Sequence, residues 1–348
     1  MQIRLVWILG FKRIHTIMMG RQAFSEQRII DCLVSDYGIE VAKFTFLPLG
    51  ADMNASVYKA ISPDNTTYFV KLKRGHHHEI NIEVAKLLHA SGIQQIIPPI
   101  KTRKGQSTQP IDDFTLIVYP YVEGQDGFTR SLTDYQWIAL GKAMRQVHEI
   151  EVPALIQKEL RREAYSAKWR EIVRSLYLHI ETEIMQDEIA AQLTTFMKKN
   201  SVAIHRLVDR SEQLAQLLQQ ESPQFVLCHS DIHGGNVLMN GNTTLYIVDW
   251  DEPMMAPKER DLMYIGAGVA NVWNDPREVT LFYEGYGKTE VNMAMLSYYR
   301  HERIVEDIAL FGQDLLLMSA GGANRSEIFK FFIAMFEPNG VVEIAFKS

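Results

Sequence analysis

The sequence predicts an α+β fold with two lobes, a small antiparallel-sheet lobe followed by a larger, mostly helical lobe. The length of 348 residues favours two lobes, because single hydrophobic cores rarely grow beyond about 250–300 residues. Short β-rich runs separated by turn residues fill the chain up to residue 122, whereas helical spacing of apolar residues dominates after it. We therefore expect lobes at residues 21–122 and 123–348, and we take residues 1–20 as a disordered or artefactual N-terminal extension outside the fold.

The first lobe is expected to begin with a helix. Apolar residues recur at helical spacing between Ser25 and Tyr37, and Gly38 follows directly, which is typical of a helix that ends at a glycine. Turn residues divide the rest of the lobe into β-rich runs, with one helix among them. The expected strands lie at residues 44–60, as two strands joined by a turn, at 68–72 and at 114–121, and the expected helix at 78–91.

The second lobe is expected to be built from helices around one short β segment. Thr133 and Gln136 have the spacing of a capping box, followed by apolar residues at helical positions. Helical patterns also cover residues 151–221 and 293–318. Between them, Asn240-Gly241 separates two apolar runs and predicts a hairpin with a two-residue turn.

Composition excludes several classes of protein. The formal net charge is −6, so we expect no nucleic-acid partner. No run of about 18 apolar residues predicts a transmembrane helix. The two cysteines, Cys32 and Cys228, lie in apolar surroundings and are expected to be buried thiols, which favours a reducing, cytoplasmic location. We expect a cytoplasmic monomer that acts on a small molecule.

The most informative motif runs from His229 to Asp251. Asp231 and Asn236 stand five positions apart in a glycine-rich loop, and Asp249 ends an apolar run further on. This spacing is typical of the catalytic core of kinase-like phosphotransferases. Asp231 would accept the proton of an incoming hydroxyl, whereas Asn236 and Asp249 would supply hard oxygen ligands for Mg²⁺ on the phosphates of ATP. Taken singly, each of these residues could simply cap a loop or a strand end or form a turn, but their joint spacing favours the catalytic interpretation.

A lysine for the phosphates of the nucleotide is expected on the third strand. Lys71 is the leading candidate, and Lys73 shares its strand face by alternation. Such a lysine needs a carboxylate on the next helix, where Glu79 is slightly favoured over Glu83.

Further nucleotide contacts are expected at a turn and at the link between the lobes. The turn from Gly50 to Ser56, with Asn54, would cradle phosphate oxygens through its backbone, and an ordinary hairpin turn is the alternative. Tyr119 and Tyr121 lie at the link, where backbone groups would meet adenine.

Acidic and aromatic residues are candidates for the substrate pocket. Asp251 and Glu252 follow the metal-ligand candidate Asp249, and either a substrate role or a solvated loop charge fits them. Glu302 and Glu306 share one face of a long helix and would bind amino groups, although a surface ion-pair network is the plainer reading. Trp273 would form a wall of the pocket, although core packing is the commoner use of tryptophan.

With these motifs the chain resembles the aminoglycoside phosphotransferase family of the protein-kinase-like superfamily, over about residues 22–346. The matching segments are Tyr68–Leu72, Val147-His148, Leu227–Leu238, Ile247–Asp251 and Asp261-Leu262. Within that family it resembles the spectinomycin phosphotransferase branch, through Trp169–Arg174, Asp249–Pro253, Pro257–Leu262 and Tyr299–Ile308. The resemblance implies a bilobal protein-kinase-like fold, with a nucleotide-binding first lobe and a catalytic, substrate-binding second lobe. It also implies MgATP as donor and a hydroxyl of a cationic aminocyclitol antibiotic as acceptor.

One departure and two alternatives accompany this resemblance. The expected phosphate loop holds a single glycine, Gly50, so the choice between ATP and GTP stays open. A metabolic kinase acting on choline, homoserine or a sugar would use the same machinery. A pseudokinase that only binds is disfavoured because Lys71, Asp231, Asn236 and Asp249 are all present.

Overall fold

The computed structural model describes residues 25–47, 55–75, 80–185, 187–317 and 325–348. The expected extension at 1–20 lies outside these residues, and so do the predicted site residues Gly50, Asn54 and Glu79. Contacts divide the chain into two compact units. The first runs to Arg130 and includes Asn236–Asp251, and the second comprises Ser131–Gly235 and Glu252–Ser348. The first unit thus gains a hairpin from much later in the chain, which the single border predicted at residue 122 does not include.

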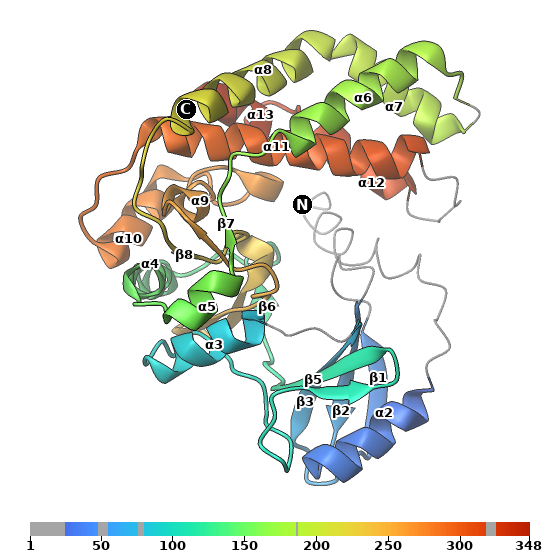
Figure 1. Ribbon diagram of the computed structural model, residues 1–348, viewed down its shortest axis with the longest axis vertical. Coiled ribbons are helices and arrows are strands. Elements are labelled where there is room, and N and C mark those ends of the chain that lie inside the picture. Colours follow the sequence, from blue (N-terminus) through green and yellow to red (C-terminus); the bar gives the residue numbers. More distant parts are fainter. Residues whose placement is uncertain (1–24, 48–54, 76–79, 186, 318–324) are drawn as a thin grey trace. The chain divides into compact units, whose positions relative to one another are not determined.

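The first unit contains a five-stranded antiparallel sheet in the order β1-β2-β3-β5-β4 (Figure 1). Its strands are β1 (Lys43–Leu47), β2 (Ala55–Ile61), β3 (Thr67–Arg74), β4 (Gln109–Ile111) and β5 (Phe114–Pro120). The expected strands are confirmed, and β4 is an addition. Val70 and Leu72 alternate into the core, so Lys71 and Lys73 point to the other face of the central strand β3.

Helix α2 (Glu26–Cys32) covers the core face of this sheet. It continues as a π-helical turn (Leu33–Tyr37) that stops at Gly38, whose φ of 73° is left-handed. Glycine adopts this conformation without steric cost, which explains the predicted stop. Ile29 and Leu33 pack against Val70 and the neighbouring strands. The second helix of this unit is α3 (Ile80–Ala90).

A second sheet of the first unit has the order β10-β9-β6. Its strands are β6 (Gln125–Asp126), β9 (Val237–Asn240) and β10 (Thr244–Ile247). The predicted hairpin is present, but the prediction of a two-residue turn is wrong. Asn240 pairs with Thr244, which leaves three residues in the loop. A two-residue type I′ turn needs positive φ at both central residues, and of Asn240 and Gly241 only the glycine has it.

The second unit is mostly helical, as expected. Its helices are α4 (Asp134–Glu149), α5 (Ala154–Glu159), α6 (Lys168–Thr182), α7 (Glu188–Lys199), α8 (Ser201–Leu218), α9 (Glu259–Leu262), α10 (Pro276–Tyr286), α11 (Met293–Leu317), α12 (Arg325–Ala334) and α13 (Val341–Phe346). Short strands β7 (Arg161–Arg162), β11 (Met254–Ala256) and β8 (Val226–Cys228) form a small sheet in that order. The long helix α11 packs against α6 and α8 (Figure 1), and its buried face supplies much of the core.

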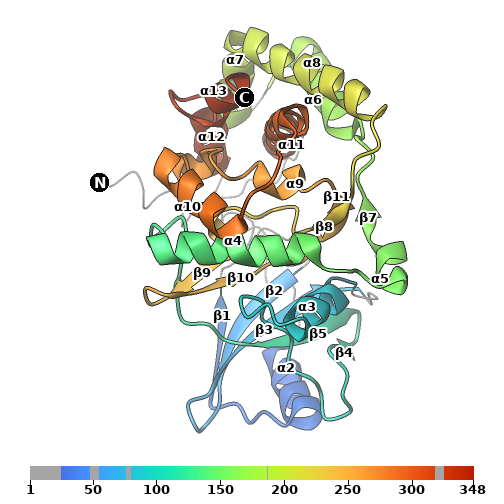
Figure 2. The same cartoon turned by 90° about the vertical axis from the view of Figure 1, so that its left-hand side faces the viewer.

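Helices α4 and α10 lie against each other (Figure 2). The capping box predicted at the start of α4 is confirmed, because Thr133 and Gln136 exchange hydrogen bonds between side chain and backbone. The close approach of the two helices depends on glycine. A Cβ atom added to Gly141 would lie 2.1 Å from the carbonyl oxygen of Phe282, so any larger residue there would push the helices apart.

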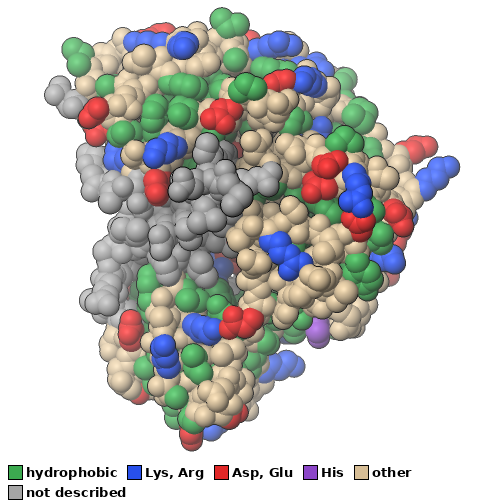
Figure 3. Space-filling model, turned by 180° about the vertical axis from the view of Figure 1, so that it is seen from behind, with side chains coloured by type: hydrophobic (Ala, Val, Ile, Leu, Met, Phe, Trp, Pro, Cys, Tyr) green, Lys and Arg blue, Asp and Glu red, His purple; other side chains and the backbone are tan. Residues whose placement is uncertain are grey.

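The described surface and interior agree with the charge and cysteine content. Figure 3 shows Lys and Arg side chains interspersed with Asp and Glu on one face, without an extended field of one sign among the side chains described there. Cys32 and Cys228 are both buried and free, as predicted. Within the described part of the chain, every helix is too short or too polar to span a membrane.

Candidate active site

The first unit brings the predicted lysine to a pair of aspartates. Because β3 alternates, the Lys71 side chain leaves the core and its Nζ lies 2.5 Å from Asp251 Oδ2 and 3.9 Å from Asp249 Oδ1. Lys73 Nζ lies 3.8 Å from the same Asp251 oxygen. Burial by itself would lower the pKa of Lys71, whose side chain is 13% exposed, but the two aspartates raise it above the usual value. Lys71 is therefore a fixed positive charge.

Among the described residues, Asp251 is the carboxylate that holds Lys71. The sequence predicted Glu79 or Glu83 for this role, and of these two only Glu83 lies within the described residues. Burial would raise the pKa of Asp251, but Lys71 and Lys73 lower it, so the carboxylate is ionised. Glu83 instead pairs with Lys86, with 2.8 Å between Oε1 and Nζ. Lys71 and Asp251 are 180 residues apart in the chain, so their pairing leaves no signal in local sequence.

The two metal-ligand candidates lie at the ends of one hairpin in this unit. Asn236 is buried just before β9, and its carbonyl oxygen accepts a hydrogen bond from the Val248 amide at 2.9 Å. Asp249 follows Val248, has a left-handed φ of 65° and carries a half-exposed carboxylate. An amide oxygen and a carboxylate beside a lysine suit a hard divalent cation on phosphate oxygens.

Other predicted nucleotide contacts lie on β2 and β5. Ser56 is half-buried on β2 opposite Leu72, next to the Lys71 position. Tyr119 is half-buried on β5, with its ring centroid 6.4 Å from that of Phe69. Tyr121 follows β5 and packs under Lys59, whose Nζ lies 4.0 Å from the ring centroid. These positions stay candidates for nucleotide contact.

In the second unit, Asp231 is held by three side chains. Its Oδ1 accepts hydrogen bonds from Arg303 Nη1 at 2.5 Å and from the Tyr264 hydroxyl at 2.8 Å. His233 Nε2 lies 3.3 Å from Oδ2. Burial would raise the pKa of Asp231, but His233, Arg303 and these hydrogen bonds hold it well below the usual value. The carboxylate is ionised and 40% exposed, as a general base must be.

Hydrogen bonds to Asp261 anchor the loop that carries Asp231. This buried carboxylate accepts hydrogen bonds from the backbone amides of His229 at 2.8 Å and Ser230 at 2.7 Å, and from His148 Nε2 at 3.0 Å. Burial would raise the pKa of Asp261, but the bonds to His148 and the loop lower it. These contacts support Ser230 in its left-handed conformation, with φ of 72°, immediately before Asp231.

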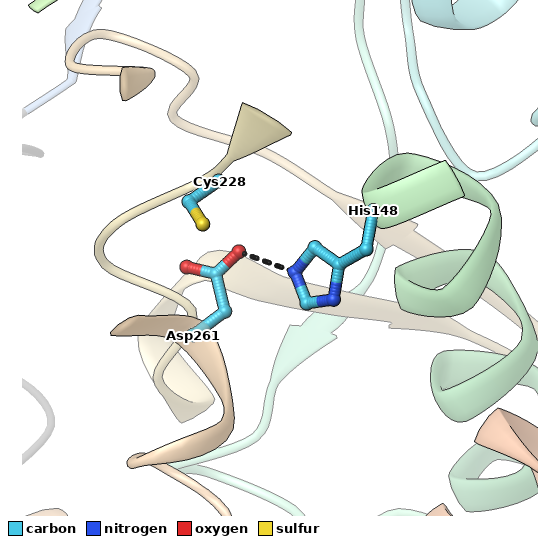
Figure 4. A group of neighbouring side chains, drawn as sticks. All are labelled: His148, Cys228 and Asp261. Atoms are coloured by element: carbon cyan, nitrogen blue, oxygen red, sulfur yellow. Dashed lines mark hydrogen bonds and ion pairs between the residues drawn. The ribbon is translucent and has the colours of Figure 1, made fainter. Parts of the chain in front are cut away.

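His148, Cys228 and Asp261 lie close enough together to raise the question of a metal site (Figure 4). Their chemistry argues against one. The carboxylate already accepts three hydrogen bonds, and His148 Nδ1 accepts another from the Tyr286 hydroxyl at 2.7 Å. Burial raises the pKa of the Cys228 thiol well above its usual value, so the thiolate that a metal would need is disfavoured. We assign this cluster to support of the loop.

The predicted substrate residues divide into buried and exposed ones. Trp273 is 4% exposed and packs edge-on against Trp137, so it belongs to the core and does not form a pocket wall. Glu302 is also buried, with Oε2 2.6 Å from Arg170 Nη1. Glu252 is exposed and pairs with Arg161 at 2.9 Å. Glu306 is half-buried; its charge helps to raise the pKa of Arg260 and Arg303, and among the described residues its carboxylate accepts no hydrogen bond.

Sequence reasoning missed Tyr264, Arg303 and Asp307. Arg303 and Asp307 lie in the segment Tyr299–Ile308 that carries the resemblance, but no spacing rule connects either to Asp231, 72 residues from Arg303. The helical spacing of four residues does predict that Arg303 and Asp307 share a face, and Arg303 Nε lies 3.0 Å from Asp307 Oδ1.

Comparisons with known proteins agree with this geometry. The chain is 53% identical to a solved spectinomycin phosphotransferase in complex with ADP and spectinomycin, with a TM-score of 0.88 over 93% of this chain and 98% of that one. An AMP-bound complex of spectinomycin phosphotransferase is 51% identical, with a TM-score of 0.84 over 92% and 98% of the two chains. Protein StrN of Streptomyces griseus is 26% identical over 192 residues, which span 51% of this chain and 57% of that relative.

The fold and the family follow from these observations. The predicted α+β fold of the kinase-like type is confirmed by the solved structures and by the antiparallel sheet and helices described above. The model of the phosphotransferase enzyme family, APH, matches residues 45–296, most of the chain. The chain therefore belongs to the phosphotransferase enzyme family.

Proposed function

We propose that this protein transfers the γ-phosphate of ATP to a hydroxyl group of spectinomycin. The observation that carries the proposal is the 53% identity, over nearly the full length of both chains, to a spectinomycin phosphotransferase solved with ADP and spectinomycin. The ionised, half-exposed Asp231 supports it, because transfer to an alcohol needs a group that takes up the hydroxyl proton.

In the proposed reaction Asp231 orients the hydroxyl and accepts its proton. The hydroxyl oxygen forms a bond to the γ-phosphorus, the bond from that phosphorus to the bridging oxygen of ADP breaks, and ADP leaves with the electron pair. The low pKa of Asp231 makes it a weak base, which suits a transition state in which the proton moves late and positioning matters most.

The nucleotide would be held by residues of the first unit. Lys71 keeps its positive charge and would contact the phosphates, with Asp251 fixing its ammonium group. Asn236 and Asp249 would hold Mg²⁺, which when bound neutralises phosphate charge. Ser56, Tyr119 and Tyr121 stay candidates for contact with the nucleotide.

For the acceptor we propose Glu306 as the acidic contact. Glu302, its neighbour one helical turn earlier, is occupied by Arg170, and Glu252 by Arg161. Glu306 lies on α11, where its charge acts on Arg260 and Arg303, and among the described residues its carboxylate accepts no hydrogen bond, so its oxygens can accept one from an amino group of the substrate. The cytoplasmic location and the monomeric state expected from the sequence stay predictions.

The direct test is release of ADP from MgATP by purified protein in the presence of spectinomycin. We expect spectinomycin-dependent turnover that Asp231→Asn reduces by at least about 100-fold while ATP binding is retained. Choline, homoserine and kanamycin serve as alternative acceptors. Turnover with one of these and not with spectinomycin would replace the proposed acceptor and leave the kinase chemistry in place.

A further inference from the structure

Arg303 lies between two carboxylates and makes a different contact with each. Its Nη1 donates to Asp231 Oδ1 at 2.5 Å, and its Nε donates to Asp307 Oδ1 at 3.0 Å. Nη1 also lies 2.8 Å from the oxygen of the Tyr264 hydroxyl. The guanidinium is planar, and its side chain is only 18% exposed, so these contacts fix its orientation.

The hydrogen bonds distinguish the two oxygens of Asp231. A carboxylate oxygen has two lone pairs, and Oδ1 already accepts from both Arg303 and Tyr264. On the other side, the Gly235 amide donates to His233 Nδ1 at 3.0 Å, so in the neutral ring the proton is on Nε2. That nitrogen faces Oδ2 at 3.3 Å, a longer contact than either bond to Oδ1.

We propose that Arg303 is a positioning residue for the transfer step. Together with Tyr264 it holds Oδ1 of Asp231 in place and thereby fixes the orientation of the carboxylate toward the acceptor hydroxyl. The proposal rests on the proposed function, because it assigns a task to a residue that holds the proposed base.

The charges around this contact determine its effect on pH dependence. His233, Tyr264 and Arg303 face Asp231, whereas Asp307 and Glu306 face Arg303, and Arg260 faces Tyr264. Arg303 favours the ionised form of Asp231, so its removal raises the pKa of the base. Because the base then becomes protonated at a higher pH, the acidic limb of the profile of kcat/KM against pH moves to higher pH.

The test compares Arg303→Gln, Arg303→Lys and a matched control, Arg300→Gln. Arg300 is on the same helix and donates to the backbone carbonyls of Met263 and Ile265, on either side of Tyr264. It therefore reports the loss of a half-buried arginine whose hydrogen bonds and ion pairs with the described residues do not include the proposed base itself. For Arg303→Gln we expect kcat to fall at least about tenfold with a KM for spectinomycin within about threefold, and the acidic limb of kcat/KM to move to higher pH.

Arg303→Lys should return the acidic limb toward that of the wild type, because it restores the charge. It should recover kcat only in part, because an ammonium lacks the planar fork that reaches both carboxylates. A folded Arg303→Gln protein with wild-type kcat and an unmoved acidic limb would overturn the proposal. The proposal would also be overturned if Arg300→Gln lost as much kcat as Arg303→Gln and moved the acidic limb by as much.

A second measurement separates this proposal from the proposed function. Melting temperatures are compared for Asp231→Asn, Arg303→Gln and the double variant, which needs no turnover. If the contact is real, the two single shifts do not add in the double variant. Simple addition overturns the role of Arg303, whereas non-addition together with absent spectinomycin turnover overturns the proposed acceptor only.

Discussion

Replacement of Asp261 by asparagine tests how the loop that carries Asp231 is held. Asp261 is 1% exposed and accepts three hydrogen bonds, with Ser230 on Oδ1 and with His229 and His148 on Oδ2. An amide keeps one acceptor oxygen and places an NH₂ group where the other was. In either orientation at least one buried N–H then faces another donor.

The size of the effect follows from this count. One buried donor left unsatisfied costs about 1–3 kcal/mol, and two of them, in the less favourable orientation, about twice that. We expect the free energy of unfolding to fall by about 2–4 kcal/mol. The second unit has roughly 200 residues, a size for which about 1 kcal/mol shifts the melting temperature by about 2–4 °C. The expected loss is therefore about 4–16 °C.

Calorimetric melting and steady-state ADP release measure both consequences of Asp261→Asn. We expect kcat to fall along with the melting temperature, because the backbone before Asp231 loses its anchor. Tyr286→Phe is the control, since it removes only the outer bond to His148 Nδ1. A melting temperature within about 1 °C of the wild type with unchanged kcat would refute the reasoning.

The pH dependence of this stabilisation has a definite sign. Folding lowers the pKa of Asp261 below 3.8, so the folded state holds fewer protons on this group than the unfolded state. The contribution is fully present above the unfolded pKa and is lost as the pH falls through the folded value. The difference in stability between wild type and Asp261→Asn should therefore shrink only in strong acid.

Three further changes test individual contacts. Lys71→Met should lower kcat/KM for ATP by about 100-fold and Lys73→Met by less than about fivefold, since Lys71 makes the shorter contact with Asp251. Initial-rate kinetics measure both variants, and equal losses would contradict this prediction. Glu302→Ala should lower the free energy of unfolding by about 3–5 kcal/mol, because it leaves the charge of Arg170 buried without its carboxylate partner. The KM for spectinomycin should not change. A raised KM at wild-type stability would instead place Glu302 in the substrate site. Burial raises the pKa of Asp307 from 3.8 to about 6, so this group makes folding more favourable as the pH falls through that window; melting curves of Asp307→Asn should lack this rise, and a rise equal to that of the wild type would refute it.

Local sequence patterns determined the elements of this fold and the position of each chemical group along the chain. Alternation on β3 placed Val70 in the core and Lys71 on the opposite face, and a glycine with positive φ ended the first helix. The spacing of Asp231, Asn236 and Asp249 identified the chemistry. Strand alternation and helix ends depend on residues two to four positions apart, and backbone geometry fixes these relations without the rest of the molecule. The catalytic motif is recognised from its residue types and their spacing alone.

The tertiary structure decided which side chains meet. Lys71 pairs with Asp251, Glu302 is taken by Arg170, and Arg303 reaches Asp231. Each of these pairs joins residues at least 72 positions apart, so neither helical nor strand periodicity relates them. Their proximity comes from the packing of whole elements, such as α11 against α6, and that packing depends on the summed burial of many side chains.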